Sequence, residues 1–303
     1  MSDDLAIEIR GLEKAYGPVR ALRGVDLEVH RGEVFGFLGP NGAGKTPTIR
    51  CMLDLIRPQA GSIRVLGLDP QAAPQAVRAR VGYLPGELNL EPNLRVGATL
   101  RYLAALRGNR LDWGFVEQLA SRLQLSLNAP VKNLSKGNKQ KVGMIQALMA
   151  RPDLLLLDEP TSGLDPLMQQ EVYRLIEEAR EGGATVFFSS HVISEVEVLA
   201  SRVAIIRQGR IVETVAPRQL LSMTTRRVRL RFMEAVDAQV LAEAPGVTAL
   251  SQEDATSATL QVEGGMDGLI KALAGLPVAD LQTGHPSLEE LFLAYYEEQG
   301  EAA

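Results

Sequence analysis

The sequence lacks several features that would mark particular classes of protein. Its 303 residues include one cysteine, Cys51, so a secreted fold held by internal disulfides is excluded. No apolar run approaches the roughly 18 residues that a membrane-spanning helix needs. The formal net charge is -5, which argues against a nucleic-acid-binding protein. The acidic start, MSDD, is unlike a secretory signal, so we expect a cytoplasmic chain without direct membrane insertion.

Apolar residues, by contrast, are plentiful, and they follow either the alternating pattern of strands or the three-to-four-residue spacing of helices. Short strand-like runs fill residues 5–38, a glycine-rich loop follows at Gly39, and a helical pattern comes next. A mostly helical stretch follows at about 87–150, and strands then alternate with helices from residue 153. The sequence therefore predicts an α/β domain over residues 1–223 that contains a helical subdomain.

The pattern changes near residue 224. Six short elements follow in the order β-α-β-β-α-β, and an amphipathic helix, PSLEELFLAYYEE, closes the chain. We expect a second, small α+β domain of ferredoxin-like type at residues 225–303.

A phosphate-binding loop is indicated between the first strands and the first helix. GPNGAGKT fits the pattern G-x-x-x-x-G-K-[ST], in which backbone N–H groups cradle phosphates, Lys45 reaches the β- and γ-phosphates and Thr46 binds Mg²⁺. A glycine-rich turn that merely caps a helix is the alternative. The candidate nucleotide-binding residues here are Gly39, Pro40, Asn41, Gly42, Ala43, Gly44, Lys45, Thr46 and Pro47.

Pro47 is unusual in this loop because it has no backbone N–H to offer a phosphate. A charge-assisted hydrogen bond is worth about 1.5 to 3 kcal/mol, so we expect ATP binding to be weakened but not abolished.

Two carboxylates end an apolar, strand-like run in LLLLDEP. Asp158 is placed to hold Mg²⁺ through its water shell, and Glu159 to accept a proton from an attacking water. The alternative is a structural helix N-cap.

The segment LSKGNKQKV, residues 134–142, resembles the LSGGQ signature of ABC transporter ATPases. It matches at Leu134, Ser135, Gly137 and Gln140 and departs at Lys136 and Asn138. The resemblance implies that Ser135 and Gly137 cover the γ-phosphate bound by a second subunit. It also implies the fold of that family, in which the phosphate-loop core carries an antiparallel β subdomain and a helical subdomain.

The resemblance extends over about residues 5–223 and implies further roles. Tyr16 falls where the family stacks an aromatic ring on adenine, although a core tyrosine at a strand end is the alternative. Asp165, in SGLD, falls in the loop that couples the two sites. His191 matches the switch histidine that contacts the γ-phosphate, so the implied catalytic residues are Lys45, Glu159 and His191.

One family feature is missing. Gly86 stands where a glutamine is usual, followed by Glu87, which leaves open whether Glu87 replaces the glutamine at Mg²⁺. The resemblance makes residues 86–95 the candidate surface for a permease.

The similarity is greatest to ATPases that serve ABC-2 type export permeases for drugs, antibiotics or sodium. It implies that two copies associate head to tail around two ATP molecules with Mg²⁺, and that hydrolysis drives efflux through a separate membrane permease. The chain would then lie peripherally on the cytoplasmic face of the membrane. Two alternatives remain: an ABC ATPase without a transport role, and a nucleotide sensor without useful turnover. The transported substrate is not readable.

Overall fold

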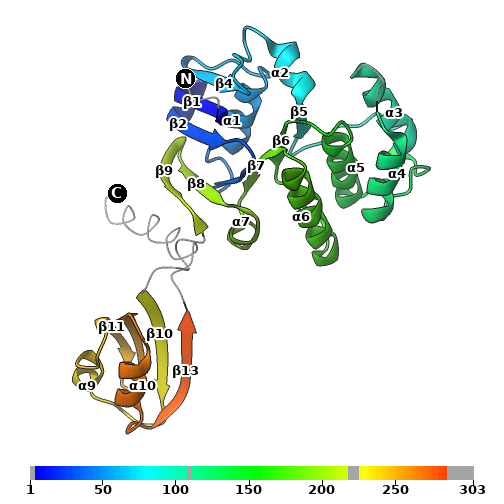
Figure 1. Cartoon of the computed structure of the whole chain (residues 1–303). Coiled ribbons are helices and arrows are strands. Elements are labelled where there is room, and N and C mark those ends of the chain that lie inside the picture. Colours follow the sequence, from blue (N-terminus) through cyan, green and yellow to red (C-terminus); the bar gives the residue numbers. More distant parts are fainter. Residues whose placement is uncertain (1–3, 108–110, 218–224, 285–303) are drawn as a thin grey trace. The chain divides into compact units, whose positions relative to one another are not determined.

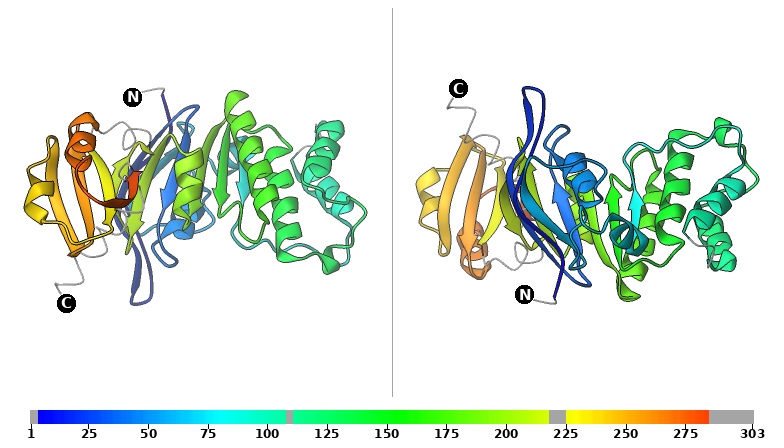
Figure 2. Two further views of the ribbon diagram at one scale, coloured as in Figure 1. Left: turned by 90° about the horizontal axis from the view of Figure 1, so that it is seen from below. Right: turned by 90° about the horizontal axis from the view of Figure 1, so that it is seen from above.

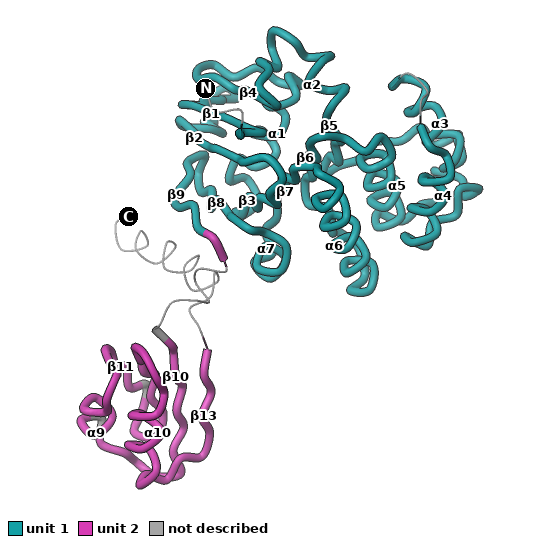
Figure 3. The backbone as a smooth tube through the Cα atoms, in the orientation of Figure 1, with its two compact units in different colours: residues 1–215 teal, residues 216–303 magenta. Residues whose placement is uncertain are grey.

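The computed structural model describes residues 4–107, 111–217 and 225–284. The chain divides into two compact units, residues 1–215 and 216–303 (Figures 1 and 3). The helix expected from PSLEELFLAYYEE lies outside the described residues. No helix in the described ranges has the length and apolar character needed to cross a bilayer.

The larger sheet of unit 1 has the strand order β5-β6-β7-β3-β8-β9. Its strands are β3 (Val34–Leu38), β5 (Val81–Leu84), β6 (Leu154–Asp158), β7 (Thr185–Ser190), β8 (Arg202–Arg207) and β9 (Arg210–Val215). Pairing is parallel from β5 to β8, and β9 is antiparallel to β8. Every residue of β3, β6 and β7 is buried, as expected for parallel strands covered on both faces. The expected α/β class is confirmed.

A second sheet of unit 1 is antiparallel and has the order β2-β1-β4. Its strands are β1 (Leu5–Tyr16), β2 (Val19–His30) and β4 (Ala60–Val65). Its apolar side chains share one core with those of β3, β6 and helix α1 (Lys45–Met52). This core fixes the base of the glycine-rich loop between β3 and α1.

The remaining helices of unit 1 are α2 (Pro74–Arg80), α3 (Val96–Leu106), α4 (Trp113–Arg122), the 3-10 turn η1 (Val131–Asn133), α5 (Lys136–Leu148), α6 (Pro166–Glu181) and α7 (Ile193–Leu199). Figures 1 and 2 show α3 and α4 at the opposite end of unit 1 from β1 and β2. Within this helical region α5 contacts both α3 and α4, and it also packs on β5 of the larger sheet.

Unit 2 contains β10 (Thr225–Phe232), α9 (Ala238–Ala242), β11 (Val247–Asp254), β12 (Ser257–Glu263), α10 (Asp267–Leu273) and β13 (Val278–Gly284). These strands form one antiparallel sheet of order β11-β12-β10-β13. Val228, Leu230 and Phe232 alternate along β10 and are buried in a core that belongs to this unit.

Candidate nucleotide-binding site

The glycine-rich loop lies where the sequence predicts it, between β3 and α1. Gly44 immediately precedes α1 with φ 116°, and a Cβ there would lie 2.8 Å from the carbonyl oxygen of Ala21 on β2. Only glycine fits this close approach without strain. The loop is thus held against the antiparallel sheet while its backbone turns into the helix.

Lys45 is the first residue of α1, and its side chain is only 5% exposed. Its Nζ donates to the carbonyl oxygens of Gly39, at 2.6 Å, and Pro40, at 3.2 Å. Glu159 Oε1 lies 3.7 Å from the same Nζ. Burial lowers the pKa of Lys45, and the charges of Glu159 and Asp158 oppose that effect.

Asp158 is the last residue of β6 and is 1% exposed. The Thr46 hydroxyl donates to Asp158 Oδ2 at 2.6 Å, and the Ser189 hydroxyl donates to Oδ1. The buried carboxylate is therefore satisfied by two hydroxyls. Ser189 was not predicted from the sequence; its place before His191 in FFSSH was the available signal.

Glu159 follows β6 with φ 52°, a left-handed conformation that is uncommon for a residue with a side chain. Its backbone N–H donates to the Ser189 carbonyl oxygen at 3.2 Å, and its own carbonyl oxygen accepts from Gln140 Nε2 at 2.8 Å. The side chain contacts His191, with Oε1 3.0 Å from Nδ1. The structure thus brings Lys45, Glu159 and His191 together at the end of the loop.

A cavity of about 630 Å³ opens beside this cluster. Tyr16 lines it together with the glycine-rich loop and Glu159, so the predicted base-stacking residue and the loop border one space. The ring of Tyr16 has Lys14 Nζ 5.2 Å from its centroid. Polar lining residues that the sequence did not reveal are Arg20, Arg23, Arg50 and Gln208, and Val19 and Ala21 also line the cavity. Arg20 and Arg23 follow Tyr16 across the β1–β2 turn, and this closeness in sequence could have indicated that they line the same cavity.

Seven predicted residues do not line this cavity. They are Gly39, Ala43, Asp158 and His191, which lie in or next to the cluster described above, and Ser135, Gly137 and Asp165. Ser135 caps α5, where its hydroxyl accepts from the Asn138 backbone N–H at 3.2 Å. Asp165 caps α6 by accepting from the Met168 N–H at 3.0 Å. Gly137 packs so closely that a Cβ there would lie 2.4 Å from the Gly163 carbonyl oxygen. In this chain these residues fix the local geometry of the segments LSKGNKQKV and SGLD.

Gly86 lies next to the buried carboxylate, because a Cβ at this position would be 3.2 Å from Asp158 Oδ2. Glu87, the alternative ligand considered from the sequence, is exposed. A longer side chain at position 86 would therefore point at Asp158. Because residue 86 is glycine, no side chain from this position contacts the carboxylate.

Comparison with known proteins agrees with this geometry. The family model described as "ABC transporter" matches residues 22–162. The daunorubicin/doxorubicin resistance ATP-binding protein DrrA of Streptomyces peucetius is 34% identical over 308 residues, covering 95% of this chain and 92% of that protein. The bacitracin transport ATP-binding protein BcrA of Bacillus licheniformis is 37% identical over 216 residues, covering 69% of each.

Among solved structures, an ATP-binding subunit of an ABC transporter superposes with a TM-score of 0.65 at 28% identity, covering 72% of this chain and 92% of that one. Together with the relatives above and the loop, strand-end and signature residues, this shows that the chain belongs to the ATP-binding subunits of the ABC transporter family, which are ATPases.

Proposed function

We propose that this chain is the ATP-hydrolysing subunit of an exporter, in which two copies close head to tail around two ATP molecules and drive efflux through a separate membrane permease of the ABC-2 type. The observation that carries the proposal is the convergence of Lys45, Glu159 and His191 beside the glycine-rich loop. The similarity to DrrA, a daunorubicin/doxorubicin resistance protein, and to BcrA, a bacitracin transport protein, supports an export role.

At this site each side chain has a separate task. Lys45 places a positive charge at the loop, where the β- and γ-phosphates bind. Glu159 takes a proton from the attacking water, and His191 orients the Glu159 carboxylate through their contact. Tyr16 stacks on the base at the other end of the same cavity.

The site also suits Mg²⁺. Thr46 and Asp158 place a hydroxyl and a carboxylate 2.6 Å apart. The described residues contain no group of three or more His, Cys, Asp or Glu side chains that could hold a metal. Mg²⁺ usually takes one or two protein ligands and completes its shell with water and phosphate oxygens, so this sparse set fits. Bound there, Mg²⁺ would neutralise phosphate charge.

A second copy would complete the site, because the signature residues Ser135 and Gly137 do not border this chain's own cavity. Ser135 is exposed at the first turn of the 13-residue helix α5, whose amino end favours a phosphate. A two-fold head-to-tail dimer would bring this helix end to the partner's triphosphate.

We also propose a fold for unit 2 and a permease-binding surface on unit 1. The element order and strand order of unit 2 support a ferredoxin-like domain. Residues 86–95 remain our candidate surface for the permease, and contact with the permease would hold the chain at the cytoplasmic face of the membrane.

Phosphate release by the purified chain tests the proposal. Replacing Glu159 with Gln should lower turnover by about 10²-fold or more, because a general base contributes that much. Glu243→Gln, an exposed position in unit 2, is the control and should keep full activity. Equal rates for wild type and Glu159→Gln would refute hydrolysis at this site.

The dimer has its own test. With ATP, Glu159→Gln should form a dimer in which a cross-linker joins position 135 of one copy to the loop around position 45 of the other. A strictly monomeric protein under these conditions would refute the composite site.

A further inference from the structure

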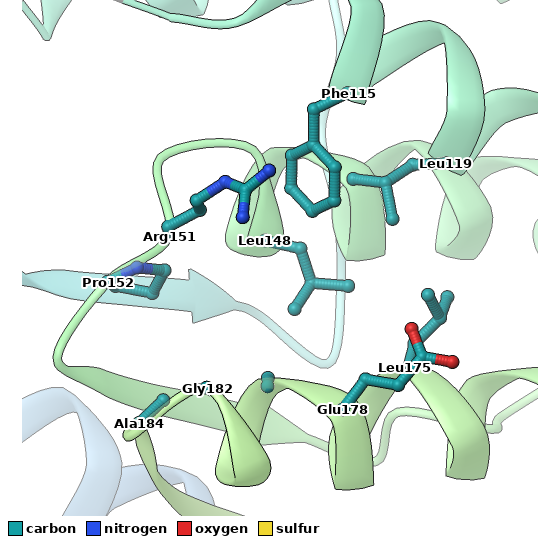
Figure 4. Close-up of a pocket in the computed structure, with 10 residues that line it drawn as sticks. Phe115, Leu119, Leu148, Arg151, Pro152, Leu175, Glu178, Gly182 and Ala184 are labelled. Carbon is teal, nitrogen blue, oxygen red and sulfur yellow. The ribbon is translucent and has the colours of Figure 1, made fainter.

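Unit 1 contains a second cavity, separate from the nucleotide site, between α4, α5 and α6 (Figure 4). Its volume is about 200 Å³, and it shares no lining residue with the cavity beside the glycine-rich loop. The motifs described above do not include the residues that form it.

The walls of this cavity are apolar. Phe115 and Leu119 come from α4, Leu148 ends α5, and Leu175 belongs to α6. The three leucines are nearly fully buried, with exposures of 1%, 5% and 3% in that order. Apolar cavities of about 150 Å³ take up benzene in other proteins, so this volume suits one aromatic ring with a short substituent.

One cation stands at the rim. Arg151 lies in the connection from α5 to β6, and its guanidinium carbon is 4.2 Å from the centroid of the Phe115 ring. Figure 4 shows it reaching toward that ring. The part of the chain that the structure describes supplies no carboxylate within ion-pair distance of Arg151. A guanidinium without a counter-ion can pair with an incoming carboxylate in bidentate fashion.

The acidic residue of the lining does not compete for this charge. Glu178 accepts two hydrogen bonds from Arg122, at 2.6 and 2.7 Å. The same hydrogen bonding lowers the pKa of Glu178, so it stays ionised and neutralised by Arg122. The rim is therefore positive on the side of Arg151.

We propose that this cavity is a binding site for a small aromatic carboxylate, with the ring between Phe115 and the leucines and the carboxylate on Arg151. Such a ligand touches α4 of the helical region and α6 of the core at once. Because it binds only the folded chain, it stabilises the protein against heat in proportion to its occupancy.

The test uses the full chain, with 3-phenylpropionate and its uncharged amide as probes. Ligand-observed NMR titration should show the acid binding about ten-fold more tightly than the amide, the usual value of one charge-assisted hydrogen bond. Arg151→Gln should remove the difference and Arg151→Lys should keep most of it. The acid should also raise the melting temperature, and saturating ATP should not displace it.

A variant whose side chain fills the cavity provides a second test of the proposed binding site. Ala179 lines the cavity from α6, so Ala179→Leu should abolish binding of both probes while the melting temperature of the free protein stays close to that of wild type. Three results would overturn the proposal: no binding of the acid, equal affinity for acid and amide, or displacement of the acid by ATP. Retained binding in a folded Ala179→Leu protein would overturn it as well.

Discussion

Position 86 offers the most direct test at the scale of single residues. Because a Cβ there would lie 3.2 Å from Asp158 Oδ2, a glutamine amide would reach the buried carboxylate and the Mg²⁺ that we propose it holds. We expect Gly86→Gln to lower the Mg²⁺ concentration for half-maximal hydrolysis by about ten-fold, the value of one hydrogen bond to a charged group. Gly86→Ala adds the same Cβ without the amide. If the two variants respond equally to Mg²⁺, the amide is not the cause.

Pro47 is a second single residue whose replacement should change nucleotide binding. It lies in the first turn of α1 and lines the nucleotide cavity. We expect Pro47→Thr to tighten ATP binding by about one to two orders of magnitude, because it returns an N–H to the phosphate-binding turn. Pro47→Ala, which restores the N–H without a hydroxyl, should show most of the gain. Calorimetric titration with ATP measures both, and unchanged or poorer affinity would contradict the explanation.

Short motifs indicated which residues gather around the glycine-rich loop, but not the contacts that those residues make across the fold. Lys45, Glu159 and His191 belong to separate motifs, and the structure brings them together. Ser189 was missed because its contact with Asp158 depends on the pairing of β6 with β7, which its place in FFSSH does not by itself reveal. Gln208 was missed for a similar reason, since it reaches the cavity from the turn between β8 and β9.

At the scale of elements, α5 packs very closely against the SGLD segment. A Cβ on Gly137 would lie 2.4 Å from the Gly163 carbonyl oxygen, so Gly137→Ala forces the two backbones apart. We expect a loss of about 1 to 3 kcal/mol in unfolding free energy, as for other overpacked sites, together with reduced hydrolysis. Gly275→Ala is the control because nothing lies within 4 Å of its added Cβ. Equal urea midpoints for the two variants would contradict the close packing.

Arg122 joins α4 to α6 through ion pairs with Glu171 and Glu178. We expect Arg122→Met to cost about 1 kcal/mol of unfolding free energy near neutral pH. The value is small because Glu178 is about half exposed and the more buried Glu171 keeps its pair with Arg174. The pKa of Glu178 is lowered in the folded state, so this stabilisation is present above the ordinary carboxyl range and is lost as the pH falls through the lowered pKa.

The measurement is urea unfolding of wild type and Arg122→Met over a range of pH, down to the lowest value at which both stay folded. The difference in unfolding free energy between wild type and Arg122→Met should become smaller as the pH falls. Lys271→Met, which removes one exposed ion pair with Asp267 and touches neither glutamate, serves as the control. If this difference does not change with pH, the ion pairs of Arg122 with the two glutamates are not the cause of the stabilisation.

Periodicity predicted the types of element better than their lengths. The pattern of residues 5–38 predicts short strands, yet β1 and β2 each contain 12 residues, because the hairpin pairs along its whole length through register shifts. In unit 2 the first predicted helix is present as α9, with five residues, and it begins where Asp237 accepts from the Gln239 N–H as its N-cap.

For the whole molecule, the division into two units leads to a further prediction. Every residue that lines the nucleotide cavity lies before Val215, and unit 1 has a core of its own. A chain that ends at Val215 should therefore bind ATP within a few-fold of the full chain, as measured by calorimetry. Lys45→Ala in the same shortened chain should abolish that binding. A folded shortened chain that does not bind ATP would show that unit 2 supports the site.

The order of strands in the larger sheet also bears on how the protein is made. β3 carries the glycine-rich loop, yet its neighbours are β7 and β8, with Phe35 opposite Phe187 and Arg202. A ribosome therefore releases this apolar strand long before either neighbour has been translated. Until then β3 is an aggregation-prone edge, and nascent chains stalled before residue 185 should depend on chaperones to remain in solution.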